Sequence, residues 1–371
     1  MSSNSKLLST DQEDLFFENS AVGKLKKEIW DASDEQVDKW LAEYEVPTPP
    51  EWAKPGAYIQ TTVRADLEER RKKNDIVLIP IGCTENHGQH TVSAMDTFFA
   101  TAICEGVRRY SEKQGCPVSV AMPPLLYGCH PYHHIGMPGT VIIRENVAKE
   151  FLIDVMLGLY NDGFRKQILV NNHGHMWVLE AAIQQFCKRY QLPGLFRVMD
   201  WHRATREFWR TKEFGGKFDT PFIHADEAET SVGRLMFPDM VDMSKAQEAE
   251  GEMLMPGGHM DTSVDTYARP SRWSECEGHA SIEIKGTPEG VVGKPTLGDP
   301  EKAKKPVLAI MKYLTLLINE TLEAFPAGTV PPTDKVTLRD PKELEPYLRE
   351  PMSEGWKSVY GLPQVGPFHS A

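Results

Sequence analysis

The side chains best suited to binding a metal ion gather in three short segments of the chain. Segment 83–96 carries a carboxylate and an imidazole two residues apart, segment 171–175 carries two imidazoles, and segment 224–231 carries both kinds. The carboxylate and imidazole side chains of these segments include Glu85, His87, Asp96, His173, His175, His224 and Glu229. Mixed imidazole and carboxylate ligands are typical of zinc, manganese or iron sites rather than of calcium or magnesium sites.

Each of these segments also has an ordinary structural interpretation when it is taken alone. Two histidines around a glycine, as in His173 to His175, are common in surface loops. An acidic residue in the first turn of a helix, such as Glu229, usually complements the helix dipole. The distribution of histidines nevertheless favours one shared site, because seven of the 12 lie in only three loops. These seven are His87, His90, His130, His133, His134, His173 and His175.

The elements that would position these segments alternate between short apolar strands and longer helices. Strands are expected at 76–81, 118–122, 167–170 and 195–199, and helices at 63–73, 97–112, 145–161, 178–190 and 302–322. Such alternation is typical of parallel βαβ units, whose apolar strands are buried on both faces. The predicted fold class is therefore α/β, a layered α/β/α arrangement with a parallel-dominated central sheet.

The polar segments are expected to meet at one edge of that sheet. Segments 83–96, 127–140 and 171–175 each follow one of the predicted strands. Ligands of open α/β sheets bind just beyond the carboxyl ends of the strands. Three loops that are far apart in the sequence should therefore converge there.

Composition and charge narrow the classes of protein to which the chain could belong. The formal net charge is −12, from 53 acidic and 41 basic residues, which disfavours a nucleic-acid partner because phosphate binding needs a basic face. No apolar run reaches the roughly 18 residues of a membrane span, and the polar N-terminus does not resemble a secretory signal. The six cysteines are scattered, as in reduced proteins. We expect a cytoplasmic globular protein with no nucleic-acid or membrane partner.

Three regions are expected along the chain. Residues 1–57 form an N-terminal extension, in which a capping box at Ser33 begins a helix and a Pro-rich linker follows. Residues 58–324 form the catalytic domain. Residues 325–371 form a Pro-rich tail, which is expected to lie on the surface or against a neighbouring subunit.

Several motifs, in the same order along the chain, resemble those of the creatininase (creatinine amidohydrolase) family. Segment 79–88, which reads Ile-Pro-Ile-Gly-Cys-Thr-Glu-Asn-His-Gly, resembles the opening motif of the family, and Asp96-Thr97 resembles the Asp-Thr pair that follows it. Segments 171–175 and 224–231 resemble its later His-containing motifs, and Gly139-Thr140 matches its Pro-Gly-Thr loop. Segment 290–300 resembles its last motif with an insertion. The resemblance covers about residues 58–322.

The resemblance implies a creatininase-like fold and two divalent metal ions per chain. The implied ligands are Glu85, Asp96, His173 and His175 for one ion, and His87, Asp96 and Glu229 for the other. Two cations about 3.5–4 Å apart lower the pKa of a shared water, so that metal-bound hydroxide attacks a substrate carbonyl at neutral pH. His224 and His175 are the expected catalytic residues, and His224 would carry a proton to the leaving atom.

Two departures from the family pattern bear on the metal and on the substrate. Creatininase has a carboxylate where this chain has His175, and the exchange for an imidazole favours zinc, with manganese and iron as alternatives. The loop at 128–134 is longer and richer in histidine than the family pattern. Its expected substrate-binding residues are His130, Tyr132, His133 and His134. Both departures argue against creatinine as the substrate.

The length of the chain, its N-terminal extension and its His-rich loop resemble the branch of the family that hydrolyses 3-dehydro-scyllo-inosose, a diketo-inositol. The expected reaction is then carbon–carbon ring opening to a keto acid in inositol catabolism. A hydrolase of the C–N bond in a cyclic amide is the first alternative, and an inactive metal-binding scaffold is the second. Because creatininase-like proteins assemble as hexamers, the resemblance also implies a homo-oligomer.

Overall fold

A four-stranded parallel sheet forms the centre of the molecule. The computed structural model describes residues 6–48, 51–129, 136–250, 252–253, 284–285 and 287–365. The strands are β3 (Ile76–Ile81), β4 (Ser119–Val120), β5 (Lys166–Asn171) and β6 (Leu195–Asp200), in the order β4-β3-β5-β6. In the register of the sheet, Ile81 pairs with Asn171 and Asn171 pairs with Asp200, so that three strands end together.

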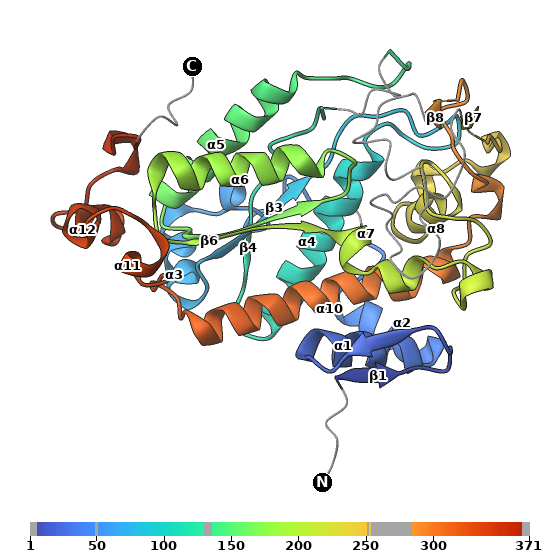
Figure 1. Ribbon diagram of the computed structural model, residues 1–371, viewed down its shortest axis with the longest axis horizontal. Helices are drawn as coiled ribbons and strands as arrows, with labels where there is room; N and C mark the ends of the chain where they lie inside the picture. Colours follow the sequence, from blue (N-terminus) through green and yellow to red (C-terminus); the bar gives the residue numbers. More distant parts are fainter. Residues whose placement is uncertain are drawn as a thin grey trace, which may run out of the picture.

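Helices cover both faces of this sheet. Helices α4 (Met95–Lys113) and α10 (Pro300–Ala324) lie on one face, and α5 (Glu145–Asn161) and α6 (Met176–Tyr190) lie on the other (Figure 1). Alternate residues of β3 supply the two cores, because Leu78 faces α4 and α10 whereas Val77 and Ile79 face α5 and α6. Every residue of β3 and β5 is buried. The predicted layered α/β fold is confirmed.

The predicted elements agree with the observed ones apart from their ends. Helix α3 (Arg64–Lys73), β3 and α5 match closely, whereas the strand expected at 118–122 is only two residues long. Helices α4 and α6 begin two residues earlier than expected, and α10 extends two residues further in both directions. Because α4 begins at Met95, Asp96 lies inside its first turn.

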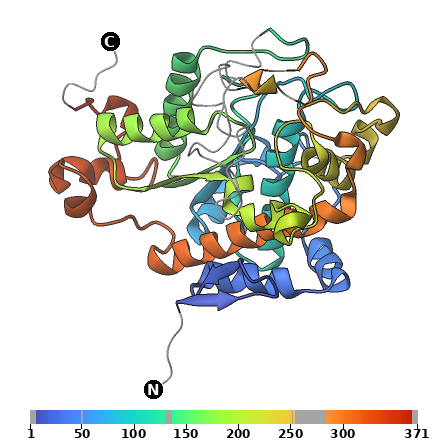
Figure 2. The ribbon, with the colours of Figure 1, turned by 45° about the vertical axis from the view of Figure 1, so that its right-hand side comes forward.

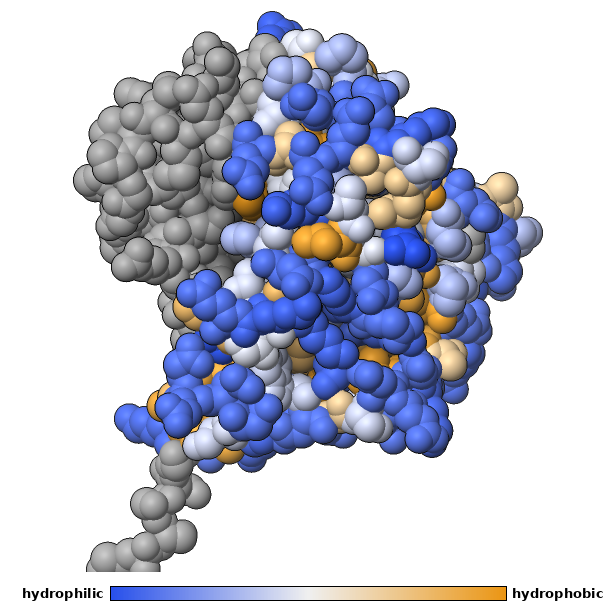
Figure 3. All heavy atoms as spheres, turned by 90° about the vertical axis from the view of Figure 1, so that its right-hand side faces the viewer, coloured by the Kyte–Doolittle hydropathy of each residue, from blue (hydrophilic) through white to orange (hydrophobic). Residues whose placement is uncertain are grey.

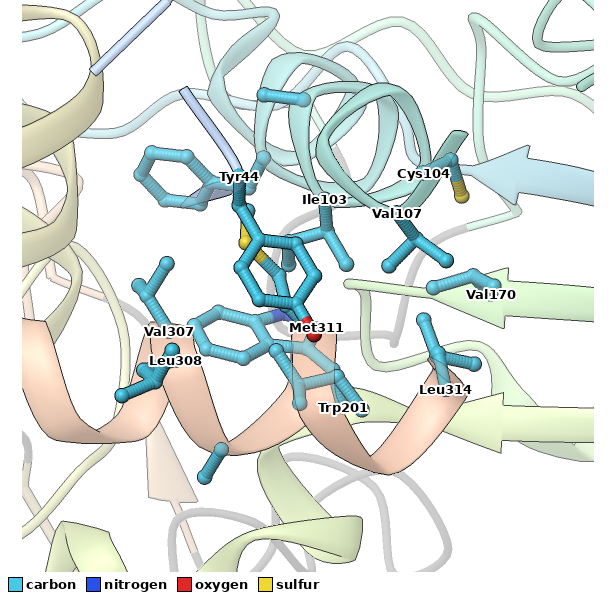
Figure 4. Close-up of a cluster of buried hydrophobic side chains, with 14 of the residues drawn as sticks. Tyr44, Ile103, Cys104, Val107, Val170, Trp201, Val307, Leu308, Met311 and Leu314 are labelled. Carbon is cyan, nitrogen blue, oxygen red and sulfur yellow. The ribbon is translucent and has the colours of Figure 1, made fainter. Parts of the chain in front are cut away.

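The N-terminal region packs onto the same core as α10. It contains the hairpin β1 (Leu7–Ser9) and β2 (Phe16–Glu18), followed by α1 (Ala21–Asp31) and α2 (Asp34–Glu43), which lie beneath α10 in Figures 1 and 2. Ser33 caps α2 as predicted, but the hairpin and α1 were not expected from the sequence. Tyr44, just after α2, lies against Met311 and Trp201 (Figure 4). The domain boundaries expected at 57 and 324 stay predictions.

Shorter elements complete the fold. They are η1 (Ile59–Thr61), α7 (Trp201–Ala204), η3 (Arg206–Trp209), η4 (Lys212–Phe214), α8 (Glu227–Met236), η5 (Pro238–Met240), η6 (Met243–Lys245), β7 (Glu252–Met253), β8 (Ile284–Lys285), η8 (Pro295–Leu297), α11 (Thr333–Val336), α12 (Pro341–Leu348) and η9 (Val359–Gly361). The tail packs on the molecule, since Leu344 and Val359 are buried in the core beside α5 and α6. Hydrophilic side chains dominate the face shown in Figure 3. Within the described residues, no helix is both long and apolar enough to cross a lipid bilayer.

Candidate metal centre

The first loop of the site is held against α4 by a close backbone contact. Directly after β3, a Cβ on Gly82 would lie 2.4 Å from both the backbone nitrogen and the Cα of Thr97. Only glycine fits there, and the Thr97 hydroxyl donates a hydrogen bond to the Cys83 carbonyl at 3.1 Å. This contact brings the residues after β3 alongside the first turn of α4, which carries Asp96.

One group of potential ligand atoms forms where β3, α4 and β5 meet. His173 Nδ1 lies 3.0 Å from Glu85 Oε2 and 3.0 Å from Asp96 Oδ2. Cys83 belongs to the same group, in which one ligand atom of each of the four residues lies within 4.8 Å of the others. All four side chains are buried.

A second group forms between the same loop, α4 and α8. His87 Nε2 lies 3.4 Å from Asp96 Oδ1 and 3.6 Å from Glu229 Oε2. The other ring nitrogen of His87 lies 3.1 Å from the Glu85 carbonyl oxygen, which directs Nε2 toward the carboxylates. Asp96 thus offers one carboxylate oxygen to each group, as a carboxylate that bridges two cations must.

The start of α8 positions both Glu229 and His224. The Asp226 side chain caps the helix by accepting hydrogen bonds from the backbone of Ala228 and Glu229. Ala225 adopts a left-handed backbone with φ of 47°, and its N–H donates to Glu229 Oε2 at 2.5 Å. A non-glycine residue in that conformation is strained, and such strain tends to occur at functional sites.

His224 is oriented by a hydrogen bond to the backbone of the first loop. Its Nε2 lies 2.7 Å from the Asn86 carbonyl oxygen, which can only accept, so Nε2 carries the proton in the neutral ring. Its Nδ1 faces the carboxylates, 3.8 Å from Glu85 Oε1 and 4.0 Å from Glu229 Oε2. With Glu85 and His87 it makes a third group of converging ligand atoms.

Burial and close opposite charges shift the pKa values of these side chains strongly. Burial lowers the pKa of His173, but the Glu85 and Asp96 carboxylates outweigh it and raise that pKa to about 10. The pKa of His87 is likewise well above its usual value, since the neighbouring carboxylates outweigh burial. Burial raises the pKa of Glu229 to about 8. Protons therefore balance the buried carboxylates at neutral pH, and divalent cations could replace them.

An outer layer of hydrogen bonds holds Asp96. The Asn172 side-chain amide donates to Asp96 Oδ1 at 2.8 Å, and its carbonyl oxygen lies 2.8 Å from His202 Nε2. Because Asn172 uses its nitrogen on Asp96, its oxygen accepts from His202. Neither of these two hydrogen bonds was expected from the sequence. The one feature of the sequence that could have suggested a role for Asn172 is its position directly before the candidate ligand His173, at the end of β5.

Three kinds of candidate residue remain, namely His175, His90 and the expected substrate-binding residues. His175 lies beside His173 with ring centroids 4.6 Å apart, but it belongs to none of the ligand groups in the described residues. Its roles as ligand and catalytic residue stay predictions. His90 Nε2 lies 2.9 Å from the Thr230 hydroxyl and links the first loop to α8. The expected substrate-binding residues His130, Tyr132, His133 and His134 lie outside the described residues.

The donor set fits divalent cations. Carboxylate oxygens and imidazole nitrogens from all three segments converge in a buried space, and two of the groups share Asp96. These are the ligand types of zinc and manganese sites. The structure therefore contains a cluster that could bind metal at the edge of the sheet where the sequence placed it.

Comparisons with known sequences find one matching family model and several related proteins. A family model for creatininase, described as creatinine amidohydrolase, matches residues 60–318. A 3-dehydro-scyllo-inosose hydrolase from Thermotoga maritima is 42% identical over 305 residues, which are 82% of this chain and 96% of that protein. A creatinine amidohydrolase from Pseudomonas putida is 26% identical over 196 residues, which are 48% of this chain and 72% of that protein.

Solved structures agree on the fold. A crystal structure of creatinine amidohydrolase superposes with a TM-score of 0.53 and 19% identity, and the match covers 73% of this chain and 98% of that one. A Zn-Zn type of creatininase mutant superposes with a TM-score of 0.54 and 18% identity over 74% of this chain and all of that one. At such low identity, these likenesses show the fold alone.

Proposed function

Because the chain belongs to the creatininase family, whose members are metal-dependent hydrolases, we propose that it hydrolyses 3-dehydro-scyllo-inosose and so acts in inositol catabolism. The observation that carries this proposal is the 42% identity to the Thermotoga hydrolase of that compound, over 96% of its length. The cluster around Asp96 supports the same reaction class, since it offers the ligands that a metal-dependent hydrolase requires.

The proposal includes two divalent cations, for which zinc is the preferred identity. Glu85, Asp96 and His173 would hold one cation, and His87, Asp96 and Glu229 the other. Bound there, the cations would lower the pKa of a shared water and polarise a substrate carbonyl. The burial of every one of these side chains excludes bulk water, which strengthens electrostatic interactions inside the site.

His224 would move the proton. Because Nε2 is bound to the Asn86 carbonyl oxygen, Nδ1 carries the lone pair of the neutral ring and faces the carboxylates. That nitrogen can take a proton as water adds to one ketone of the substrate, and it can return the proton to the carbon released when the carbon–carbon bond breaks. The balance is one ring diketone plus one water giving one acyclic keto acid.

The test is product analysis with the metal-replete protein. Incubation with 3-dehydro-scyllo-inosose, followed by mass spectrometry, should show the gain of one water and an acyclic keto acid. The same protein stripped of metal with a chelator and then reloaded is the matched control, and activity should be lost and regained. A ring compound left intact by protein with full metal content would refute the substrate.

The similarity to creatinine amidohydrolase supports one alternative, which is hydrolysis of the C–N bond in a cyclic amide. Release of an amine rather than a keto acid would identify it. We also propose a cytoplasmic homo-oligomer, with the hexamer as its expected form. Light scattering during gel filtration measures the assembly, and a monomer at micromolar concentration would contradict it.

A further inference from the structure

Cys83 is directed into the candidate metal centre by its position in the first loop. It lies two residues before Glu85, and His87 follows two residues later. Glu85 shares one group of converging ligand atoms with Cys83 and another with His87, so all three side chains face the same space. The Cys83 side chain is fully buried.

The contacts of Cys83 place its sulfur among the ligand atoms of the first group. Its Sγ lies 2.9 Å from Asp96 Oδ2 and 3.7 Å from Glu85 Oε2. These two oxygens are the same atoms that lie 3.0 Å from His173 Nδ1. One sulfur, two oxygens and one nitrogen thus converge from the first loop, the first turn of α4 and the residues after β5.

We propose that Cys83 is the fourth protein ligand of the cation held by Glu85, Asp96 and His173. The inference rests on the proposed metal-dependent function and specifies one of its two sites. The shared water would add to these four protein donors, since catalytic zinc can expand to five ligands, and a thiolate would favour zinc over manganese because it is a soft ligand. On binding, the sulfur exchanges its proton for the cation, and the proton leaves to solvent.

This assignment differs from the ligand set that family resemblance implied. That set used His175 as the fourth ligand, yet within the described residues His175 belongs to none of the converging groups. It occupies the N-cap position of α6, whereas Cys83 Sγ lies within 4.8 Å of all three other ligand atoms. A hydrogen bond from an intact thiol to Asp96 is the competing role for Cys83, and it would leave the sulfur protonated.

Cobalt substitution separates the two roles, because a cobalt–thiolate bond gives a charge-transfer absorption in the near ultraviolet and a thiol hydrogen bond does not. The full-length protein loaded with Co²⁺ should show this band. Cys83→Ser keeps a hydroxyl that can bond to Asp96 but should lose the band. Cys187→Ser is the matched control and should keep the band, because it removes a half-buried thiol of α6 that lies outside the ligand groups found among the described residues.

Metal selectivity gives a second readout. Cys83→Ser should lower zinc affinity by more than the ~10–100-fold expected for loss of an outer hydrogen-bond partner, with a smaller change for manganese. Two bound cobalt ions without the band, or a band that survives in Cys83→Ser, would overturn the assignment of Cys83 and leave the proposed function standing. Failure of the unaltered protein to bind cobalt at all would overturn both.

Discussion

Loss of the Asn172 side chain should weaken metal binding without removing any ligand. Asn172 is buried, and its amide donates to Asp96 Oδ1 at 2.8 Å. A hydrogen bond to a charged group contributes about 1.5–3 kcal/mol. At about 1.4 kcal/mol per tenfold change, Asn172→Ala should weaken cation binding by roughly 10–100-fold. That range agrees with the measured cost of removing outer partners of metal ligands.

Competition with a chromophoric chelator at pH 7 measures this change in zinc affinity directly. Asn161→Ala is the matched control, because Asn161 lies at the end of α5 and its side chain accepts hydrogen bonds from Ser358 and Val359 of the tail. Zinc affinity of Asn172→Ala within threefold of the unaltered protein would refute the claim that this bond orients the shared carboxylate.

Three further predictions concern the ligands and their protons. His87→Ala should lose one metal equivalent per chain as well as activity, and elemental analysis that still finds two would reject its assignment. His224→Ala should keep both metals but lose turnover by about 10²–10⁴-fold, so near-normal rates would remove it from the mechanism. Metal affinity should rise as the pH is raised through the pKa values of Glu229, about 8, and His173, about 10. Below its pKa each of these side chains holds a proton, which a cation must displace in order to bind. Calorimetry in buffers of different ionisation enthalpy counts the released protons, and zero release at pH 7 would contradict the shifts.

The central sheet could be predicted from the sequence because burial leaves a simple pattern. A continuous apolar run such as Ile76–Ile81 is stable only when both of its faces are covered, so its strand character is evident without its partners. The N-terminal hairpin and α1 carry no such pattern. Helix α1 packs against α10, where Lys305 donates a hydrogen bond to the Trp30 carbonyl oxygen across 275 residues of sequence. Contacts that distant leave no local signal.

In the candidate metal centre, the ligands could be predicted from the sequence, whereas the hydrogen bonds around them could not. Glu85, His87 and Asp96 were recognisable because their types and spacing already suit a cation, and the structure brings them together with His173 and Glu229. The hydrogen bonds that Asn172 and His202 make could not be foreseen, since amide and imidazole groups have many possible partners and only the assembled fold selects one. The substrate-binding loop stays a prediction.

The wide separation of the ligand segments also bears on how long the protein survives in the cell. The first loop and the start of α8 meet across 138 residues of sequence. A cation bound between them would act as a reversible cross-link that the unfolded chain cannot form. At 100 times its dissociation constant, such a cation stabilises the folded state by about 2.7 kcal/mol. Loss of the cation would therefore lower the free energy of unfolding as well as the activity, and a larger share of the chains would be unfolded.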